Sequence, residues 1–311
     1  MASEPLVSVV IPTHNNAALV VEAVESVLAQ TWRNVETIVV DDGSTDGTGA
    51  RLARFGSRIL LIRQQHRGPA VARNAGLRAA RGELIGFLDS DDLWMPEKLA
   101  RCAPAFAGES EVGVVYTALR IHELDTGLEY LLPQYTMSGW MARDLFVECK
   151  GVNTSTLVVR RAALDKVGLF DEELFRAQDW DLMIRLAEQF KYAHVPEVLT
   201  ERRLHRGSLS VTHRNLYAEY NLRVIRKAAM RRPDLYARLE PEAMARAHFR
   251  FGMSHYGEYE MAAARREFRR SLRRRWNWRA FNYLLRAHLP VAVVRRLRRL
   301  RAGLSDEKSH A

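Results

Sequence analysis

The sequence is poor in cysteine, with only Cys102 and Cys149 among its 311 residues. The two have no CxxC spacing, so the sequence predicts neither a disulfide framework nor a zinc site. Each is expected to be a small core residue, and a chain so poor in cysteine suits a reducing, cytoplasmic compartment.

Long apolar runs are also missing. No uninterrupted apolar stretch reaches the ~18 residues of a membrane span. The first residues, MASEPLVSVVIP, have no basic region ahead of a long apolar run. We therefore expect neither a signal peptide nor a transmembrane helix. A GxGxxG pattern is absent after the first expected strand, which argues against a dinucleotide-dependent dehydrogenase.

Charge is distributed unevenly along the chain. Residues 1–264 hold 32 Lys and Arg against 34 Asp and Glu, whereas residues 265–311 hold 15 against 3. The net charge of +10 therefore belongs to the C-terminal tail, and the rest is nearly neutral. With 47% hydrophobic residues the chain can bury a core and form one large or two modest domains.

Short apolar runs alternate with helical patterns in the first 88 residues. Strands are expected at 6–11, 35–40, 59–62 and 84–88, and helices at 18–30, 48–55 and 69–80. Such alternation predicts an α/β fold with a doubly wound, mainly parallel sheet flanked by helices. In these sheets ligands bind outside the carboxyl ends of the strands.

Three polar motifs follow expected strands: PTHN at 12–15, DDGS at 41–44 and DSDD at 89–92. The carboxylates of Asp89, Asp91 and Asp92 repel one another unless a cation is bound, and hard oxygen ligands suit Mg²⁺ or Mn²⁺ holding a diphosphate. A solvated acidic turn that caps a helix opened by Pro96 would use the same residues.

Four segments together resemble a known family. SVVIPTHN, VVDDGSTDGT, GPAVARNAGLRAARGELIGFLDSDD and AQDWDLMIRL, in this order, are similar to the motifs of family 2 glycosyltransferases with the GT-A fold, over about residues 6–210. The resemblance implies an inverting transferase that takes a sugar from a nucleoside diphosphate donor, usually a UDP-sugar, with Mn²⁺ or Mg²⁺ as cofactor.

The resemblance implies roles for residues around the donor nucleotide. Pro12 and Thr13 would line the uridine pocket, and Asp42 would accept a hydrogen bond from the uracil ring N–H, with Asp41 as its support. A turn in which DDGSTDG bonds its own backbone would use the same letters. Arg73 matches a position that touches the nucleotide, where an arginine can bind phosphate through two parallel hydrogen bonds, although it would also suit an exposed helix.

Further matches concern the metal. Asp91 matches the direct metal ligand, Asp89 matches a residue that contacts ribose or metal, and Asp92 is expected to be structural. His205 lies in a segment, RLHRGSLS, that resembles a loop closing the donor site, from which it would reach the metal or the diphosphate. His14 and His66 are expected to be ordinary surface or capping residues.

Asp179 matches the catalytic base of the family. Displacement at an anomeric carbon needs a base for the acceptor hydroxyl proton, on the face opposite the leaving diphosphate. Asp181 lies two residues on, so it points to another side of the expected helix. Asp179 would also serve as the N-cap of that helix, and Gln178 stands where many relatives have Glu.

Beyond residue 213 the sequence predicts helices at 213–231, 240–256, 259–275 and 277–301. Gly252, Ala264, Phe268 and Ser271 are spaced as in one tetratricopeptide unit, which is weak evidence because stable arrays need about three. The last stretch mixes Trp, Leu and Val with many arginines, a composition that suits an interfacial helix on anionic lipid. Nucleic acid and a solvated face are alternatives, and nucleic acid is the less expected partner.

A further strand is expected at 153–160, NTSTLVVR. The sequence therefore predicts a GT-A domain at 1–212, with a nucleotide-sugar half (1–116) and an acceptor half (117–212), and a helical, Arg-rich extension at 213–311. The predicted reaction moves a sugar to a hydroxyl of a glycan or lipid-linked acceptor at the inner face of the cytoplasmic membrane. A GT-A-like protein without activity, which binds lipid or nucleic acid through the tail, is the alternative.

Overall fold

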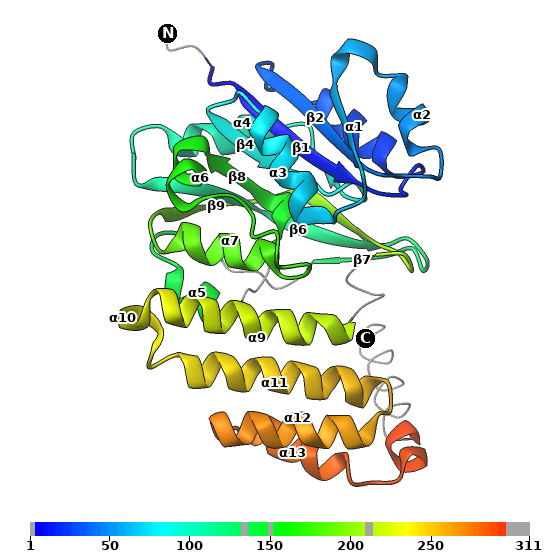
Figure 1. Ribbon diagram of the computed structural model, residues 1–311, viewed down its shortest axis with the longest axis vertical. Coiled ribbons are helices and arrows are strands. Elements are labelled where there is room, and N and C mark those ends of the chain that lie inside the picture. Colours follow the sequence, from blue (N-terminus) through cyan, green and yellow to red (C-terminus); the bar gives the residue numbers. More distant parts are fainter. Residues whose placement is uncertain (1–3, 132–135, 149–151, 209–213, 297–311) are drawn as a thin grey trace, which may run out of the picture. The chain divides into compact units, whose positions relative to one another are not determined.

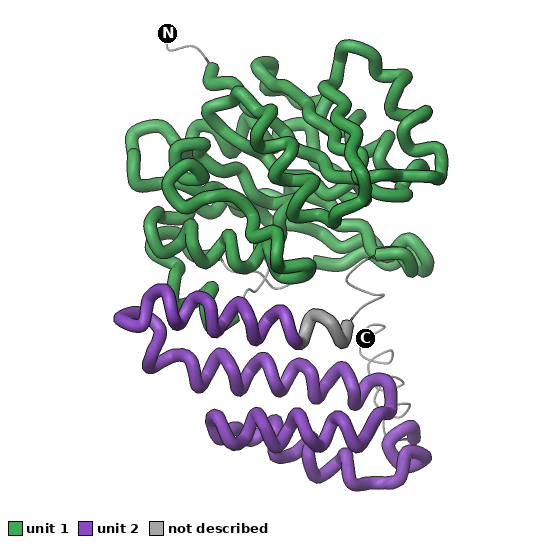
Figure 2. Tube along the Cα trace, in the orientation of Figure 1, with its two compact units in different colours: residues 1–212 green, residues 213–311 purple. Residues whose placement is uncertain are grey.

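The computed structural model describes residues 4–131, 136–148, 152–208 and 214–296. The chain forms two compact units, residues 1–212 and 213–311 (Figure 2). Cys149 and the basic residues after Arg296, for which core and tail roles were predicted, lie outside the described residues. In the described part of the chain, no helix is long and apolar enough to cross a membrane.

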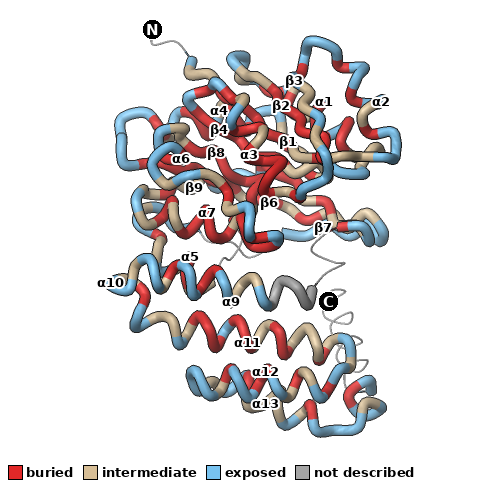
Figure 3. The backbone as a smooth tube through the Cα atoms, viewed as in Figure 1, coloured by how far each residue is buried: buried red, intermediate tan, exposed pale blue. Residues whose placement is uncertain are grey.

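The N-terminal half of unit 1 follows the predicted alternation. Strands β1 (Val7–Thr13), β2 (Val35–Asp42), β3 (Leu60–Gln64) and β4 (Leu84–Phe87) are all parallel, in the order β3-β2-β1-β4. Helices α1 (Val20–Leu28), α2 (Thr48–Ala53) and α3 (Pro69–Ala79) connect them (Figure 1). Strands β1, β2 and β4 are largely buried (Figure 3), as expected of a sheet covered on both faces, whereas β3 at the edge of the sheet is partly exposed.

The second half of unit 1 extends the same sheet with mixed pairing. The order continues β4-β8-β6-β9-β5, with β5 (Leu93–Trp94), β6 (Val112–Glu123), β8 (Leu157–Arg160) and β9 (Lys191–Leu204). Strand β8 is antiparallel to β4 and β6, β9 is parallel to β6, and β7 (Leu128–Leu131) pairs with β6. Helices α4 (Lys98–Cys102), α5 (Ala142–Val147), α6 (Arg161–Val167) and α7 (Gln178–Ala187) complete the unit. The predicted α/β sheet flanked by helices is thus confirmed.

Two local predictions in unit 1 were wrong. Residues 153–160 do not form one strand, because the Asn153 side chain accepts a hydrogen bond from Ser155 N and closes a 3-10 turn, η3 (Thr154–Thr156), before β8. Pro96 does not open a helix. Helix α4 begins at Lys98 and has no side-chain cap. No side chain of the DSDD motif therefore caps it.

Unit 2 consists of helices in its described part: α9 (Arg214–Arg231), α10 (Pro233–Tyr236), α11 (Glu240–Gly257), α12 (Met261–Arg274) and α13 (Trp278–Arg286). Helices α11 and α12 approach closely, since a Cβ on Gly252 would lie 2.4 Å from the Phe268 ring. A single helix over 277–301 was a wrong prediction. The chain leaves the helix after Arg286 and is helical again at 291–296, because Pro290 lacks an N–H and disfavours helix in the residue before it.

A buried lysine joins four segments of unit 1. The Lys98 ammonium group has three N–H donors, and Thr117 Oγ1, Thr156 O and Thr200 Oγ1 accept from it at 3.0 Å each. Its Nζ also lies 5.0 Å from the centre of the Trp94 ring. Helix α4, strands β6 and β9 and the η3 turn are thereby held at one point. Burial lowers the pKa of Lys98 to about 8.

This lowered pKa predicts a pH-dependent stability. Between pH 8 and about 10.5 the unfolded chain keeps the Lys98 proton that the folded chain has lost, so the free energy of unfolding rises with pH. The free energy of unfolding of wild type, minus that of Lys98→Met, should therefore rise by about 1.4 kcal/mol per pH unit in this window. Urea unfolding at several pH values measures it. The exposed Lys166→Met variant should keep a constant difference from wild type, and a constant difference for Lys98→Met would contradict the prediction.

Candidate active site at the carboxyl ends of the strands

The three polar motifs meet at one edge of the sheet. Strands β2 and β4 lie on either side of β1, so the strand order reverses there, and sheets of this kind bind ligands outside the carboxyl ends of the strands at such a point. Asn15 N donates to Ser44 Oγ at 2.9 Å, and Asn16 Nδ2 donates to Ser90 Oγ at 3.0 Å. Hydrogen bonds from the turn after β1 therefore reach both the DDGS and the DSDD segments.

Asp42 is buried and strongly bonded. Its Oδ1 accepts from Gln64 Nε2 at 2.7 Å and from Arg67 N at 2.9 Å, and its Oδ2 accepts from Gly68 N at 2.8 Å. His66 Nδ1 lies 2.9 Å from the same Oδ2. A carboxylate has about four acceptor positions, so three are used and His66 stands at the fourth.

Asp41 and Thr13 are neighbours in the β1–β2 register and are both buried. Asp41 Oδ1 accepts from Ser44 N at 2.9 Å, and its Oδ2 lies 3.4 Å from Arg63 Nε. Neither Asp41 Oδ2 nor Thr13 Oγ1 has a hydrogen-bond partner within the described residues. Pro12 precedes Thr13 at the half-buried end of β1. A buried polar atom without a hydrogen bond, such as Thr13 Oγ1, is costly, which marks this spot as a place for a polar ligand.

Two histidines at this edge, His14 and His66, were expected from the sequence to be ordinary surface or capping residues. The imidazoles of His14 and His66 stack, with 3.9 Å between ring centres. His14 Nδ1 donates to the Asp42 carbonyl at 2.8 Å, so the rings are fixed above the Asp42 backbone. The position of His14 inside PTHN, directly after a strand, was the available signal.

In the DSDD loop, Asp89 pairs with Arg73. Arg73 Nη2 donates to Asp89 Oδ1 at 2.5 Å, and the Arg73 guanidinium lies 5.4 Å from the Phe170 ring centre. Arg73 is buried, and its Nε and Nη1 have no hydrogen-bond partner in the described part of the chain. A guanidinium held this way orients Asp89 and keeps further donors for an anion.

Asp91 and His205 face each other. His205 Nε2 lies 3.4 Å from Asp91 Oδ2, and both side chains are partly exposed. The neighbouring Asp91 carboxylate raises the pKa of His205. His205 Nδ1 accepts from Gly207 N at 3.2 Å, so the ring proton sits on Nε2, toward Asp91. The fold therefore brings Asp91, the predicted metal ligand, next to His205 of the loop that was predicted to close the donor site.

Asp92 is buried and serves the loop itself. Its Oδ2 accepts from Ser155 Oγ at 2.6 Å and its Oδ1 from Arg203 N at 3.0 Å. Burial, together with the charges of Asp91 and Asp89, raises the pKa of Asp92 well above its ordinary value. The contacts support the structural role that was predicted for it.

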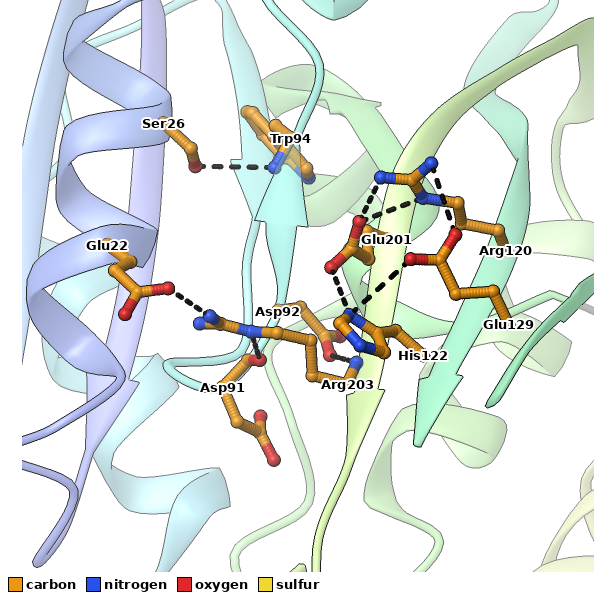
Figure 4. A network of polar contacts seen from close by, with 10 residues as sticks. All are labelled: Glu22, Ser26, Asp91, Asp92, Trp94, Arg120, His122, Glu129, Glu201 and Arg203. Carbon is orange, nitrogen blue, oxygen red and sulfur yellow. Dashed lines mark hydrogen bonds and ion pairs between the residues drawn. The ribbon is translucent and has the colours of Figure 1, made fainter. Parts of the chain in front are cut away.

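Arg203 is a further residue that the sequence did not reveal. Its buried guanidinium lies between α1 and the DSDD loop (Figure 4), where it donates to Glu22 and to the Asp91 carbonyl, and to the Leu19 carbonyl at 3.3 Å. Because Arg203 lies two residues before His205, it fixes the start of the His205 loop relative to Asp91.

Asp91 and His205 fit a divalent cation that takes few protein ligands. In the described residues there is no group of three or more His, Cys, Asp or Glu that could hold a metal ion. Asp89, predicted as an additional ligand, is engaged by Arg73. One carboxylate and one imidazole suit Mn²⁺ or Mg²⁺ when phosphate oxygens and water complete the shell.

Asp179 lies in the first turn of α7 and is not its N-cap. The cap position is Ala177, whose φ of +58° is uncommon for a residue with a side chain. Asp179 Oδ1 accepts from Trp180 N at 2.9 Å, and Oδ2 accepts from Thr154 Oγ1 at 3.3 Å. The preceding residue, Gln178, is buried and its Oε1 has no hydrogen-bond partner among the described residues.

The η3 turn connects Asp179 to the DSDD loop. Thr154 contacts Asp179, and the next residue, Ser155, accepts from Asp89 N at 3.1 Å and donates to Asp92. Asp181, by contrast, is buried and pairs with Arg185 at 2.7 Å. Of the two carboxylates in QDWD, Asp179 is thus the one at the site.

The sequence and the fold were compared with known proteins. The glycosyl transferase family 2 profile matches residues 8–166. An uncharacterized glycosyltransferase of Rickettsia typhi is 31% identical over 220 residues, which cover 70% of this chain and 69% of the relative. The chondroitin synthase of Escherichia coli is 30% identical over 233 residues, but they cover 73% of this chain and only 33% of that protein.

Solved structures show the same fold. S. aureus TarS 1-349 in complex with UDP-GlcNAc gives a TM-score of 0.66 at 21% identity, covering 86% of this chain and 81% of that one. The mannosyltransferase PcManGT of Pyrobaculum calidifontis, in complex with GDP-Man and Mn²⁺, gives 0.63 at 21% identity, covering 91% and 79%. At these identities the likeness concerns the GT-A fold alone. From the profile match and the sequence relatives it follows that this chain belongs to glycosyl transferase family 2.

Proposed function

We propose that this glycosyltransferase is an inverting, metal-assisted enzyme that moves a sugar from a nucleoside diphosphate donor, a UDP-sugar, to a hydroxyl of a glycan or lipid-linked acceptor. The observation that carries the proposal is the η3 turn. Through Thr154 and Ser155 this turn joins Asp179 of QDWD to the DSDD loop, whereas Asp181 of the same motif pairs with Arg185.

The nucleotide would lie against the ends of β1 and β2. Thr13 Oγ1 and Asp41 Oδ2 are buried polar atoms without hydrogen bonds among the described residues, and Pro12 adds an apolar surface beside them. Three N–H donors hold the Asp42 carboxylate in place. Its fourth acceptor position, now facing His66, would take the uracil N–H.

The diphosphate would lie over the DSDD loop. Asp91 and His205 would hold the metal, with Asp89 beside them, oriented by Arg73. To bind a metal through Nε2, His205 must carry its proton on Nδ1 and give up the bond from Gly207. The bound metal supplies charge neutralisation for the leaving diphosphate.

Asp179 would act as the base. As the acceptor oxygen forms its bond to the anomeric carbon, the bond from that carbon to the diphosphate oxygen breaks, and the acceptor proton moves to the Asp179 carboxylate. A single displacement with one base inverts the configuration. Thr154 and Trp180 N fix the orientation of the carboxylate before the reaction.

The acceptor class rests on relatives, since the family members compared with this chain include chondroitin and hyaluronan synthases. A glycan is therefore the first acceptor to test, with a lipid-linked glycan as the next. We propose further that the C-terminal helices bring the enzyme to an anionic membrane surface.

A panel of nucleotide sugars tests the function. Each donor is mixed with the full-length chain, Mn²⁺ and oligosaccharide acceptors, and released nucleoside diphosphate is measured. We expect release with at least one UDP-sugar and calorimetric binding of UDP in Mn²⁺. If no nucleoside diphosphate binds with or without metal, the donor assignment is wrong.

A further inference from the structure

Helix α13 has two apolar faces. One face belongs to the core of unit 2, where Ala287 is buried and the Tyr283 ring packs edge-on against Tyr256 at 5.3 Å and beside Phe268 at 5.9 Å. Leu284 packs against the same cluster. This face explains why the helix is held in place.

The opposite side of α13 carries large apolar side chains that are exposed. Trp278 is 66% exposed and Leu285 56% exposed, and they lie seven residues apart, hence on one side of the helix. Phe281 contacts both neighbouring indoles, with ring centres 5.6 Å from Trp278 and 5.1 Å from Trp276. We call this surface the outer face of α13; it consists of Trp276, Trp278, Phe281, Leu285 and Leu289.

The segment that carries the outer face is basic, and in this segment Glu242 of α11 neutralises only Arg275, the residue before Trp276. Residues 268–296 contain no Asp or Glu. Arg279 and Arg286 are also seven apart and lie about a quarter turn from Trp278 and Leu285, along one flank of the outer face. The nearest acid in sequence, Glu267, is buried and engaged by His248 and Arg270.

The positive charge beside this apolar surface indicates which kind of partner binds it. A second copy of the chain would bring like-charged arginines together. An anionic bilayer offers phosphates to the arginines and an apolar interior to the side chains between them, and tryptophan prefers the boundary between the two. Helix α13, with 9 residues, is far too short to span a bilayer and would lie in the interface plane.

We propose that the outer face of α13 is a membrane-docking surface, which inserts Trp276, Trp278 and Leu285 between the headgroups of anionic lipids while Arg279 and Arg286 bind their phosphates. The donor site lies in unit 1, so docking is independent of whether the proposed transfer chemistry is right.

Vesicle flotation with the full-length chain tests the proposal. We expect the protein to float at low salt with vesicles of phosphatidylcholine containing phosphatidylglycerol, and to stay behind with phosphatidylcholine alone. The Trp278→Ser/Leu285→Ser variant should lose at least about tenfold in partitioning, because it removes most of the apolar insertion. Met230→Ser, which changes an 82% exposed residue on α9, should float like wild type.

The charge is tested separately. Arg279→Gln/Arg286→Gln should weaken flotation about tenfold or more and flatten its salt dependence, whereas Arg33→Gln/Arg51→Gln, which removes two exposed arginines from unit 1, should not. Equal binding to neutral vesicles, or equal loss in both controls, would overturn the proposal. So would a dimer or an RNA complex that the Trp278→Ser/Leu285→Ser change abolishes while flotation is absent. Circular dichroism and UDP binding verify that each variant is folded.

Discussion

Asp179→Asn is expected to lower kcat by about 10²–10⁴-fold and to leave the Kd of the donor unchanged. The amide has the shape of the carboxylate, and its oxygen can still accept the hydrogen bond from Trp180 N, while its NH₂ group can donate to Thr154 Oγ1 in place of the bond that Thr154 gave the carboxylate. It cannot accept a proton at neutral pH. Because the change removes an interaction made only in the transition state, kcat and kcat/KM should fall together.

The matched control is Asp181→Asn, in the same motif and helix. Asp181 is buried and pairs with Arg185, which in turn donates to the carbonyls of Val167 and Leu169. Its loss should lower the midpoint of thermal unfolding and leave kcat within a few-fold of wild type. Steady-state kinetics with calorimetry of UDP binding gives both quantities. Full turnover by Asp179→Asn, or a product that retains the donor configuration by NMR, would contradict the single-displacement mechanism.

The parts of the fold that sequence predicted are those with local causes. The first four strands are short apolar runs, β-branched in β1 and β2, and α1 between them has apolar residues at helical spacing, so the sequence pattern alone locates them. The carboxyl-end rule then placed the three polar motifs at one edge. The break before residue 291 had a local cause as well, Pro290, and should have been predicted.

The contacts that complete the site could not be predicted, because they join residues far apart in sequence. Thr154 and Asp179 are separated by 25 residues, and Glu22 and Arg203 by 181. Periodicity reports which face of an element is buried, not which partner covers it. The η3 turn was missed for a related reason: TSTLVV reads as a strand by composition, and the capping side chain of Asn153 overrides that preference.

The partners of the acidic side chains in the DSDD loop could not be predicted from the sequence either. From sequence alone, its three carboxylates predicted either a bound cation or a solvated acidic turn. The fold instead gives a protein partner to each one: Asp89 pairs with Arg73, Asp91 faces His205, and Asp92 is buried against Ser155 with a raised pKa. The loop is therefore stable as it stands, and the need for a metal falls on Asp91 and His205 alone.

Because only Asp91 and His205 are left to hold the metal, we expect Asp91→Ala to remove the effect of the metal on UDP binding. The affinity of this variant for UDP in Mn²⁺ should fall at least about tenfold, about 1.4 kcal/mol, to the level that wild type shows in EDTA. In EDTA the variant and wild type should bind UDP alike, since the nucleoside contacts at β1 and β2 are untouched. Calorimetric titration with UDP in both buffers measures the four affinities. Asp165→Ala, which removes an exposed carboxylate from α6, should behave as wild type.

His205→Gln completes a double-mutant cycle. If Asp91 and His205 hold one ion, as their 3.4 Å separation suggests, each single change removes the same metal-dependent affinity and the double variant loses little more than either one. Additive losses would mean that His205 contacts the diphosphate directly. An Asp91→Ala variant that still gains affinity from Mn²⁺ would show that the metal is held elsewhere, and the assignment of Asp91 as its ligand would then be wrong.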